Sequence, residues 1–173
     1  SPATLELVLS KSALKKQWLL HDILTPPFFT IRKIAAHIVG LENLLLATSY
    51  PYILKPNMEG NSRGLDDDSI VFDQQSLIAK LMQLLKVYDE VLVEKYLGIF
   101  PDICEYTVAM VGNGDQKLLM PAQINLKQKK KLCLITTCDK ENHLTQAAVV
   151  KEPILKERLI RFSEKAFQIA DVH

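Results

Sequence analysis

Hydrophobic side chains recur at spacings of three and four residues along most of the chain, and this pattern predicts amphipathic helices. The longest such stripe runs from Asp73 to Leu97, and its apolar members are Leu77, Ile78, Leu81, Leu84, Leu85, Tyr88, Val91, Leu92 and Leu97. No proline or glycine interrupts residues 65–97, and Gly98 provides a helix stop. Because further apolar residues surround its middle, we expect this helix near the centre of the fold.

Prolines and glycines divide the first third of the chain into two further helical runs. The first run begins at Pro2, which suits the first helical position, and Ser10 marks a weak point where the helix can break. The second run begins at Pro26 and stops at Pro51, because the residue before a proline is pushed out of the helical region.

The last third of the chain is read in the same way. A shorter helix is expected from Pro101 to Met110, with a short buried strand at residues 106–111 as the alternative. Pro121 opens another helix. Residues 144–170 carry Pro153 inside an apolar pattern, which predicts two helices or one helix kinked at that proline.

Residues 51–69 read as a long connection, because two prolines and two glycines break any period there. Acidic side chains dominate residues 57–73, where Arg63 is the single basic residue; the acids are Glu59, Asp66, Asp67, Asp68 and Asp73. Loops of this length are usually mobile or functional.

Together these patterns predict an all-α protein of six to eight stacked antiparallel helices, either an irregular bundle or a short solenoid. We expect one helical domain over residues 1–173. Because the chain does not begin with Met and enters an apolar pattern at once, we also expect it to be a fragment of a longer protein.

Composition narrows the function classes only slightly. Of the 173 residues 48% are hydrophobic and 24% charged, and the net charge of +1 gives no global field for nucleic acid or a membrane surface. No apolar stretch is long enough to span a membrane. Three sparse cysteines fit reduced thiols, so we expect an intracellular protein, cytoplasmic or nuclear.

No motif in the sequence points to catalysis. The glycines at 112–115 are too few for a phosphate-binding loop. Cys133, Cys138 and His143 are spaced by five residues, about 140° apart on a helix, so they do not converge on a metal. The acids at 66–68 lack the alternation of a calcium loop. The sequence therefore predicts a protein that is not an enzyme and holds no cofactor or metal.

The remaining hypothesis is a scaffold or adaptor that binds another protein in a hetero-complex. Its candidate contacts are aromatics at helix ends, the acidic connection and a lysine cluster: Phe28, Phe29, Tyr50, Tyr52, Asp66, Asp67, Asp68, Lys117, Lys127, Lys129, Lys130 and Lys131. Residues 116–138 contain five lysines and no acid, so the alternative is a nucleic-acid-binding module that uses the lysines at 127–131.

Overall fold

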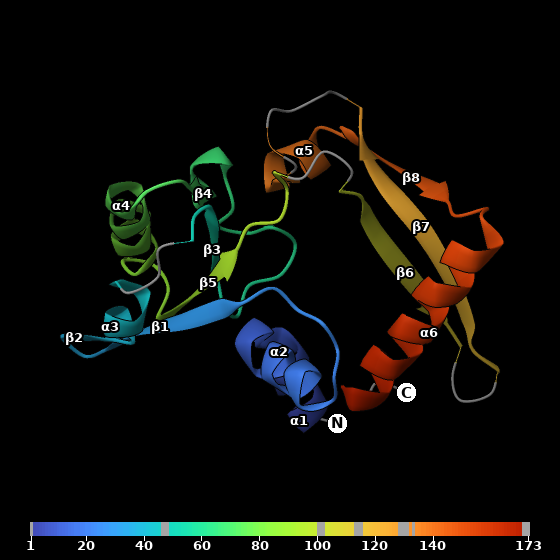
Figure 1. The fold of residues 1–173 in the computed structure, drawn as a ribbon, viewed down its shortest axis with the longest axis horizontal. Coiled ribbons are helices and arrows are strands. Elements are labelled where there is room, and N and C mark those ends of the chain that lie inside the picture. Colours follow the sequence, from blue (N-terminus) through green and yellow to red (C-terminus); the bar gives the residue numbers. More distant parts are fainter. Residues whose placement is uncertain are drawn as a thin grey trace.

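Two antiparallel β-sheets, each with helices on one side, form the protein (Figure 1). The structure is a computed structural model, and it describes residues 2–45, 49–99, 103–112, 116–127, 132 and 134–170. The all-α expectation is therefore wrong, since most of the segments read as helices are strands.

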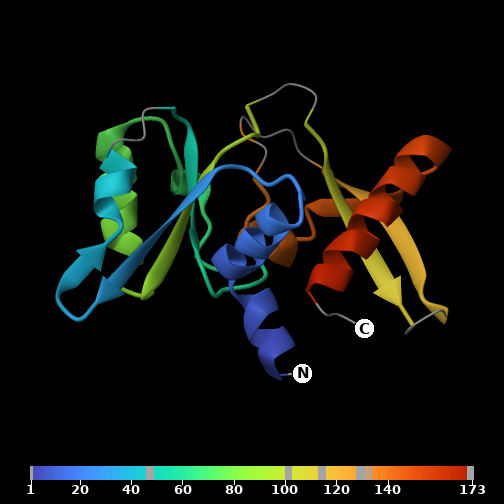
Figure 2. The ribbon, with the colours of Figure 1, turned by 60° about the horizontal axis from the view of Figure 1, so that its bottom comes forward.

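The larger sheet has five strands in the order β2-β1-β5-β3-β4. Its strands are β1 (Phe28–Ile34), β2 (His37–Val39), β3 (Tyr52–Pro56), β4 (Ile70–Val71) and β5 (Glu90–Lys95). Helices α3 (Leu41–Leu45) and α4 (Gln74–Leu84) cover one face (Figure 2). The main core lies between that face and α4, and includes Leu54, Leu77, Leu81 and Val91.

Only the first half of the stripe from Asp73 to Leu97 is helical. Asp73 is the N-cap of α4, where its carboxylate accepts a hydrogen bond from the Ser76 amide at 2.7 Å, but the helix ends at Leu84. The residues that follow turn and form β5, the central strand of the sheet. Val91, Leu92 and Val93 are fully buried there in succession. A run of apolar residues fits a strand buried on both faces as well as a helix, so spacing alone did not separate them.

The connection expected at 51–69 begins with a strand, β3, and a second strand, β4, follows directly after it. β3 is buried along most of its length, and it pairs with β5 on one side and with β4 on the other. Between β3 and β4 lie a loop and a short 3-10 helix, η1 (Asp67–Ser69). The prolines at either end of β3 were read as breaks inside a connection, whereas they flank a short, buried strand.

The helix expected from Pro26 to Pro51 is also wrong, because β1 and β2 form a hairpin there. Ala35 takes a positive φ of 53° at the turn. Thr30, Ile31 and Ile34 are β-branched and pack better on a pleated sheet than in a helix. Only α3, at the end of this segment, is helical among its described residues.

The smaller sheet has three strands in the order β6-β7-β8, and α6 packs against it. These elements are β6 (Glu105–Val111), β7 (Leu118–Leu126), β8 (Thr145–Val149) and α6 (Pro153–Ile169), with the short α5 (Thr137–Glu141) between β7 and β8. The strand alternative at 106–111 is thus confirmed, and the helix expected there is wrong. Thr145 to Val149 likewise forms a strand, so only the second half of the 144–170 run is helical.

Pro121 lies inside β7 and does not open a helix. Its carbonyl accepts a hydrogen bond from the Val150 amide at 3.1 Å, just beyond the last paired residue, Val149. The position where its N–H would be therefore faces the end of β8 and not the β6 ladder. The proline therefore removes no hydrogen bond from the ladder between β6 and β7.

Other predictions are confirmed. The first run divides at Ser10 into α1 (Pro2–Leu9) and α2 (Lys11–Leu20), and the Ser10 hydroxyl accepts from the Ala13 amide. Pro153 occupies the start of α6. None of the described helices is long and apolar enough to cross a membrane.

An ion pair joins the start of η1 to α4. Lys80 Nζ donates to both carboxylate oxygens of Asp66, at 2.7 and 2.6 Å, and the Lys80 side chain is 4% exposed whereas that of Asp66 is 53% exposed. Burial alone would raise the pKa of Asp66, but the hydrogen bonds from Lys80 and Ser69 outweigh it and hold the pKa below its usual range. The carboxylate is therefore stabilised in the folded state.

We expect Asp66→Asn to lower the free energy of unfolding by about 1–2 kcal/mol at neutral pH, because it leaves the Lys80 ammonium buried without an anion. The loss relative to the native chain should begin to shrink as the pH falls through about 3.9, and vanish only below the depressed pKa of the folded Asp66 carboxyl. Denaturant unfolding at several pH values measures both effects. Asp68→Asn, an exposed change nearby, is the control, and an equal loss in that variant would contradict the assignment.

Candidate functional site

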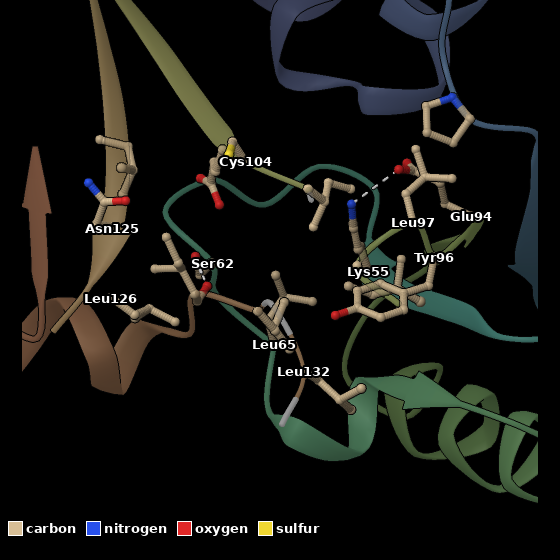
Figure 3. A pocket seen from close by; sticks show the side chains of 18 of the residues that line it. Lys55, Ser62, Leu65, Glu94, Tyr96, Leu97, Cys104, Asn125, Leu126 and Leu132 are labelled. Atoms are coloured by element: carbon tan, nitrogen blue, oxygen red, sulfur yellow. Dashed lines mark hydrogen bonds and ion pairs between the residues drawn. The ribbon is translucent and has the colours of Figure 1, made fainter. Parts of the chain in front are cut away.

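A cavity of about 630 Å³ lies between the two sheets. Figure 3 shows its opposite walls, with Lys55, Glu94 and Tyr96 on the larger sheet and Asn125 and Leu126 on the smaller one. Segments far apart in the sequence therefore meet at this one place.

The two-residue period of β3 and β5 decides which side chains face the cavity. Tyr52 and Leu54 point to α4, so the intervening Ile53 and Lys55 point to the opposite face. In the same way Val91 and Val93 belong to the core, and Glu94 and Tyr96 line the cavity. The two strands thereby present Lys55 and Glu94 to the cavity, while Leu54, Val91 and Val93 pack in the core on the α4 side.

Lys55 and Glu94 form an ion pair on this wall, with Nζ and Oε1 3.4 Å apart (Figure 3). The second carboxylate oxygen of Glu94 lies 3.2 Å from Lys15 Nζ on α2. The Lys15 ammonium also bonds the Thr25 hydroxyl and lies 5.2 Å from the centre of the Phe28 ring. Burial lowers the pKa of Lys15, and the Glu94 carboxylate opposes that shift.

Lys11, the first residue of α2, adds a third ammonium group. Its Nζ donates to the carbonyl oxygens of Pro56 at 2.9 Å and Asn57 at 3.4 Å, and also to that of Glu59. Burial lowers the pKa of Lys11, and repulsion from Lys55 lowers it further. We call Lys11, Lys15 and Lys55, with Glu94, the cationic cluster. It has three ammonium groups and one carboxylate.

Residues 57–64 form a loop, the glycine loop, that leads from β3 to the rim of the cavity. Asn61 and Ser62 have positive φ angles of 52° and 61°, and Gly64 one of 74°. A Cβ atom on Gly64 would lie 2.6 Å from Pro56 Cγ, so this position requires glycine. The Ser62 hydroxyl donates to the Ile135 carbonyl at 3.0 Å, and Lys140 Nζ to Asn61 Oδ1 at 3.2 Å. The loop is thus fastened to the segment between β7 and β8.

Away from the cationic cluster the cavity lining is mixed: it has an apolar part around Tyr96, and its polar members include Ser62, Glu105, Gln123, Asn125 and Lys140. The apolar part of the lining belongs to a second buried cluster of Ile53, Ile70, Tyr96 and Leu134, and Leu65 and Leu132 pack against this cluster. An apolar patch beside a cationic cluster fits a ligand that has a flat ring next to an anionic group. Among the described residues no group of three or more His, Cys, Asp or Glu side chains could hold a metal ion.

The aromatics expected as partner contacts lie in or beside the main core. Tyr52 is buried, and the rings of Phe29 and Tyr50 lie edge-on to it with centroids 6.3 and 5.2 Å away. Phe28 lies on the cavity side of β1, next to the Lys15 ammonium. None of these side chains stands at a helix end, and their contact with a partner stays a prediction.

The charged candidates are not brought together. Asp66 is bound to Lys80, and Asp67 and Asp68 are exposed in η1. Of the lysines, Lys117 is half-buried just before β7 and Lys127 is exposed just after it, whereas Lys129, Lys130 and Lys131 lie outside the described residues. None of the described candidates among these charged residues lines the cavity.

The residues that do build the site were missed in the sequence. Lys55 and Glu94 are each set in a run of buried apolar residues, and a charged residue inside such a run signals a functional face once the run is read as a strand. Gly60 and Gly64 follow β3 closely, which signals a tight loop at a strand end. Both signals were hidden because the strands were read as a helix and a connection.

Comparison with known proteins assigns the family. The model of the D-ala D-ala ligase C-terminus family matches residues 18–172. The chain belongs to this family. A curated relative, the D-alanine–D-alanine ligase of Syntrophotalea carbinolica, is 35% identical over 92 residues, which cover 53% of this chain and 27% of the relative.

Solved structures of D-alanine–D-alanine ligases share the fold of this D-ala D-ala ligase C-terminus chain. The Bacillus anthracis enzyme superposes with a TM-score of 0.66 at 23% identity, over 94% of this chain and 49% of that one. The same enzyme complexed with ATP gives a TM-score of 0.63 at 23% identity, over 94% and 46%. VanG D-Ala:D-Ser ligase of Enterococcus faecalis gives 0.68 at 17% identity, over 95% and 45%. The chain thus spans about half the length of these solved relatives.

Family membership overturns the functional hypotheses drawn from the sequence. A non-catalytic scaffold or adaptor is wrong, because the relatives are ligases and therefore enzymes. The alternative, a nucleic-acid-binding module, finds no support either. The description of the chain as an all-α interaction protein is therefore wrong as well.

In this D-ala D-ala ligase C-terminus chain we expect Glu94→Gln to lower the free energy of unfolding by about 2 kcal/mol, because it removes the carboxylate that faces the buried Lys15 ammonium. The loss should shrink as the pH rises toward about 10, since burial lowers the pKa of Lys15 and the unpaired lysine then sheds its proton.

Denaturant unfolding measures this loss. Glu157→Gln is the control, because it removes a carboxylate from an exposed pair with Arg161 on α6 and should change stability by less than about 0.5 kcal/mol. A loss in Glu94→Gln that grows with pH would show that Lys15 is not the group affected.

Proposed function

We propose that this chain binds ATP in the cavity between its two sheets and forms part of a ligase that joins two amino acids, D-alanine among them. The observation that carries the proposal is a cationic cluster beside an apolar patch in the cavity of a chain of this family. The solved relative complexed with ATP supports the choice of nucleotide.

The cationic cluster suits the phosphates. Lys55 lines the cavity, and Lys11 and Lys15 lie behind it on α2. With Glu94 as the carboxylate of the cluster, its three ammonium groups leave a net positive charge. Charge-assisted hydrogen bonds from buried lysines to phosphate oxygens are strong because water screens them little. The glycine loop starts beside these lysines, so its backbone amides add donors for the same anion.

The apolar end suits the base. Tyr96 and Leu97 follow β5 on the same wall as Lys55, and Leu65 packs against the buried cluster that contains Tyr96 (Figure 3). A flat purine packs well between apolar walls, and main-chain groups at the end of a strand recognise its polar edge. This apolar part of the wall therefore positions the base, while the neighbouring cationic cluster binds the phosphates.

The chain's own part in the reaction is to bind, orient and exclude water. Joining a carboxyl group to an amine is unfavourable in water and needs the free energy of nucleotide hydrolysis. A cavity closed between two sheets keeps an activated carboxyl group away from water. The relatives differ in their second amino acid, alanine or serine, so we propose a D-amino acid as the acceptor.

An intracellular location agrees with the family, whereas a nuclear one has no support. We place the protein in the cytoplasm, where ATP is available. A hetero-complex with another protein stays a prediction.

We expect the chain to bind ATP in the presence of Mg²⁺, and Lys55→Met to weaken this binding at least about tenfold, because a buried charge-assisted contact to phosphate is lost. Isothermal titration calorimetry measures both affinities. Lys16→Met, an exposed lysine on the same α2, is the matched control and should leave the affinity unchanged. Absence of ATP binding by the native chain would contradict the proposal.

In the protein that contains this chain, ATP consumption should rise when D-alanine is added, and a D-amino acid dipeptide should form in step with it. L-alanine is the control for stereochemistry. Coupled phosphate release and mass spectrometry of the product measure the two quantities. ATP consumption that is equal with either alanine, or with none, would contradict the ligase assignment.

A further inference from the structure

Asn57, the first residue of the glycine loop, is fully buried and bonded through both polar atoms of its side chain. Its Oδ1 accepts a hydrogen bond from the Ser12 amide at 2.8 Å, and its Nδ2 donates to Ser10 Oγ at 3.1 Å and to Glu90 Oε2 at 2.8 Å. The Glu90 carboxylate only accepts, so the nitrogen of the amide must face it. The orientation of the side chain is therefore fixed by chemistry.

The backbone of Asn57 bonds the same two elements. Its amide donates to the Glu90 carbonyl at 3.0 Å, and its carbonyl accepts from the Lys11 amide at 3.1 Å. One residue thus ties the end of β3 to β5 on one side and to the start of α2 on the other. Side chain and backbone act together in this link.

The elements that Asn57 joins are those that carry the cationic cluster. Lys55 lies two residues earlier on β3, and Lys11 and Lys15 lie on the first turns of α2. Among the described residues α2 has few other contacts with the larger sheet, and the lysine side chains themselves are long and flexible. The positions of the three ammonium groups relative to one another therefore depend on the short, rigid amide between their backbones.

We propose that Asn57 is a positioning residue for the phosphate end of the cavity, and that its amide sets the spacing between the lysines of α2 and that of β3. The proposal rests on the proposed function, since it assigns the anion to the nucleotide phosphates. Asn57 touches no ligand itself and acts through Lys11 and Lys55.

The chemical test is to exchange donor and acceptor. Asn57→Asp keeps the shape but sets a carboxylate against Glu90 and Ser10, where two donated hydrogen bonds stood. Adding Glu90→Gln supplies an amide that donates to the new carboxylate at position 57, while its oxygen still accepts from Arg32 Nε, which lies 2.8 Å from Glu90 Oε1. The double variant therefore restores the link with its polarity reversed.

Two properties are measured for each variant. The first is the affinity for ATP and for adenosine, each with Mg²⁺, and the second is the rate of amide hydrogen exchange at residues 10–13 and 57–60. We expect Asn57→Asp to weaken ATP binding about tenfold or more, to leave adenosine binding within about twofold, and to speed exchange in both segments. The double variant should recover most of each loss. Asn142→Asp, the same change on an exposed residue at the end of α5, should alter nothing.

The outcomes separate the two proposals. Equal loss of ATP and adenosine binding, or no recovery in the double variant, overturns the positioning role. Unchanged exchange at both segments overturns it as well, whatever the nucleotide does. If the native chain binds neither ligand while exchange still rises in Asn57→Asp and recovers in the double variant, the proposed function fails and the link between α2 and β3 stands.

Discussion

The pairing of β3 with β5 at the centre of the larger sheet is the constraint on which the rest depends. Both strands are buried on the α4 side, and the two-residue period then sends Lys55 and Glu94 to the other side together. A slip of one residue in either strand would place a charge in the core and an apolar side chain in the cavity. The same pairing register of β3 and β5 is therefore needed for a stable core and for the placement of the charged side chains in the cavity.

The sequence analysis found some helix boundaries correctly, but it assigned the wrong secondary structure to most of the segments between them. The helix break at Ser10 and the helix boundary at Pro153 were predicted correctly, because capping and proline geometry act locally. The secondary structure predicted between these boundaries was wrong wherever a strand is short and buried on both faces. Val91 to Val93 fit a helical stripe equally well, and what decides against it is pairing with β1 and β3, which are distant in the sequence.

The site was missed for the same reason. Its charged members come from β3, β5 and α2, and no two of these segments are adjacent in the sequence. Spacing rules find ligands that share one helix or one loop, whereas this site is assembled by the sheet. Only the glycine loop is local, and its glycines became informative once the strand before it was recognised.

The family match begins at residue 18, whereas two of the three lysines of the cationic cluster lie before it on α2. A boundary drawn by sequence similarity therefore cuts through this helix. An expression fragment trimmed to that boundary would keep every described strand of both sheets, yet it would lose two of the three lysines of the cationic cluster. It would also lose Ser10 and Ser12, which hold the Asn57 side chain.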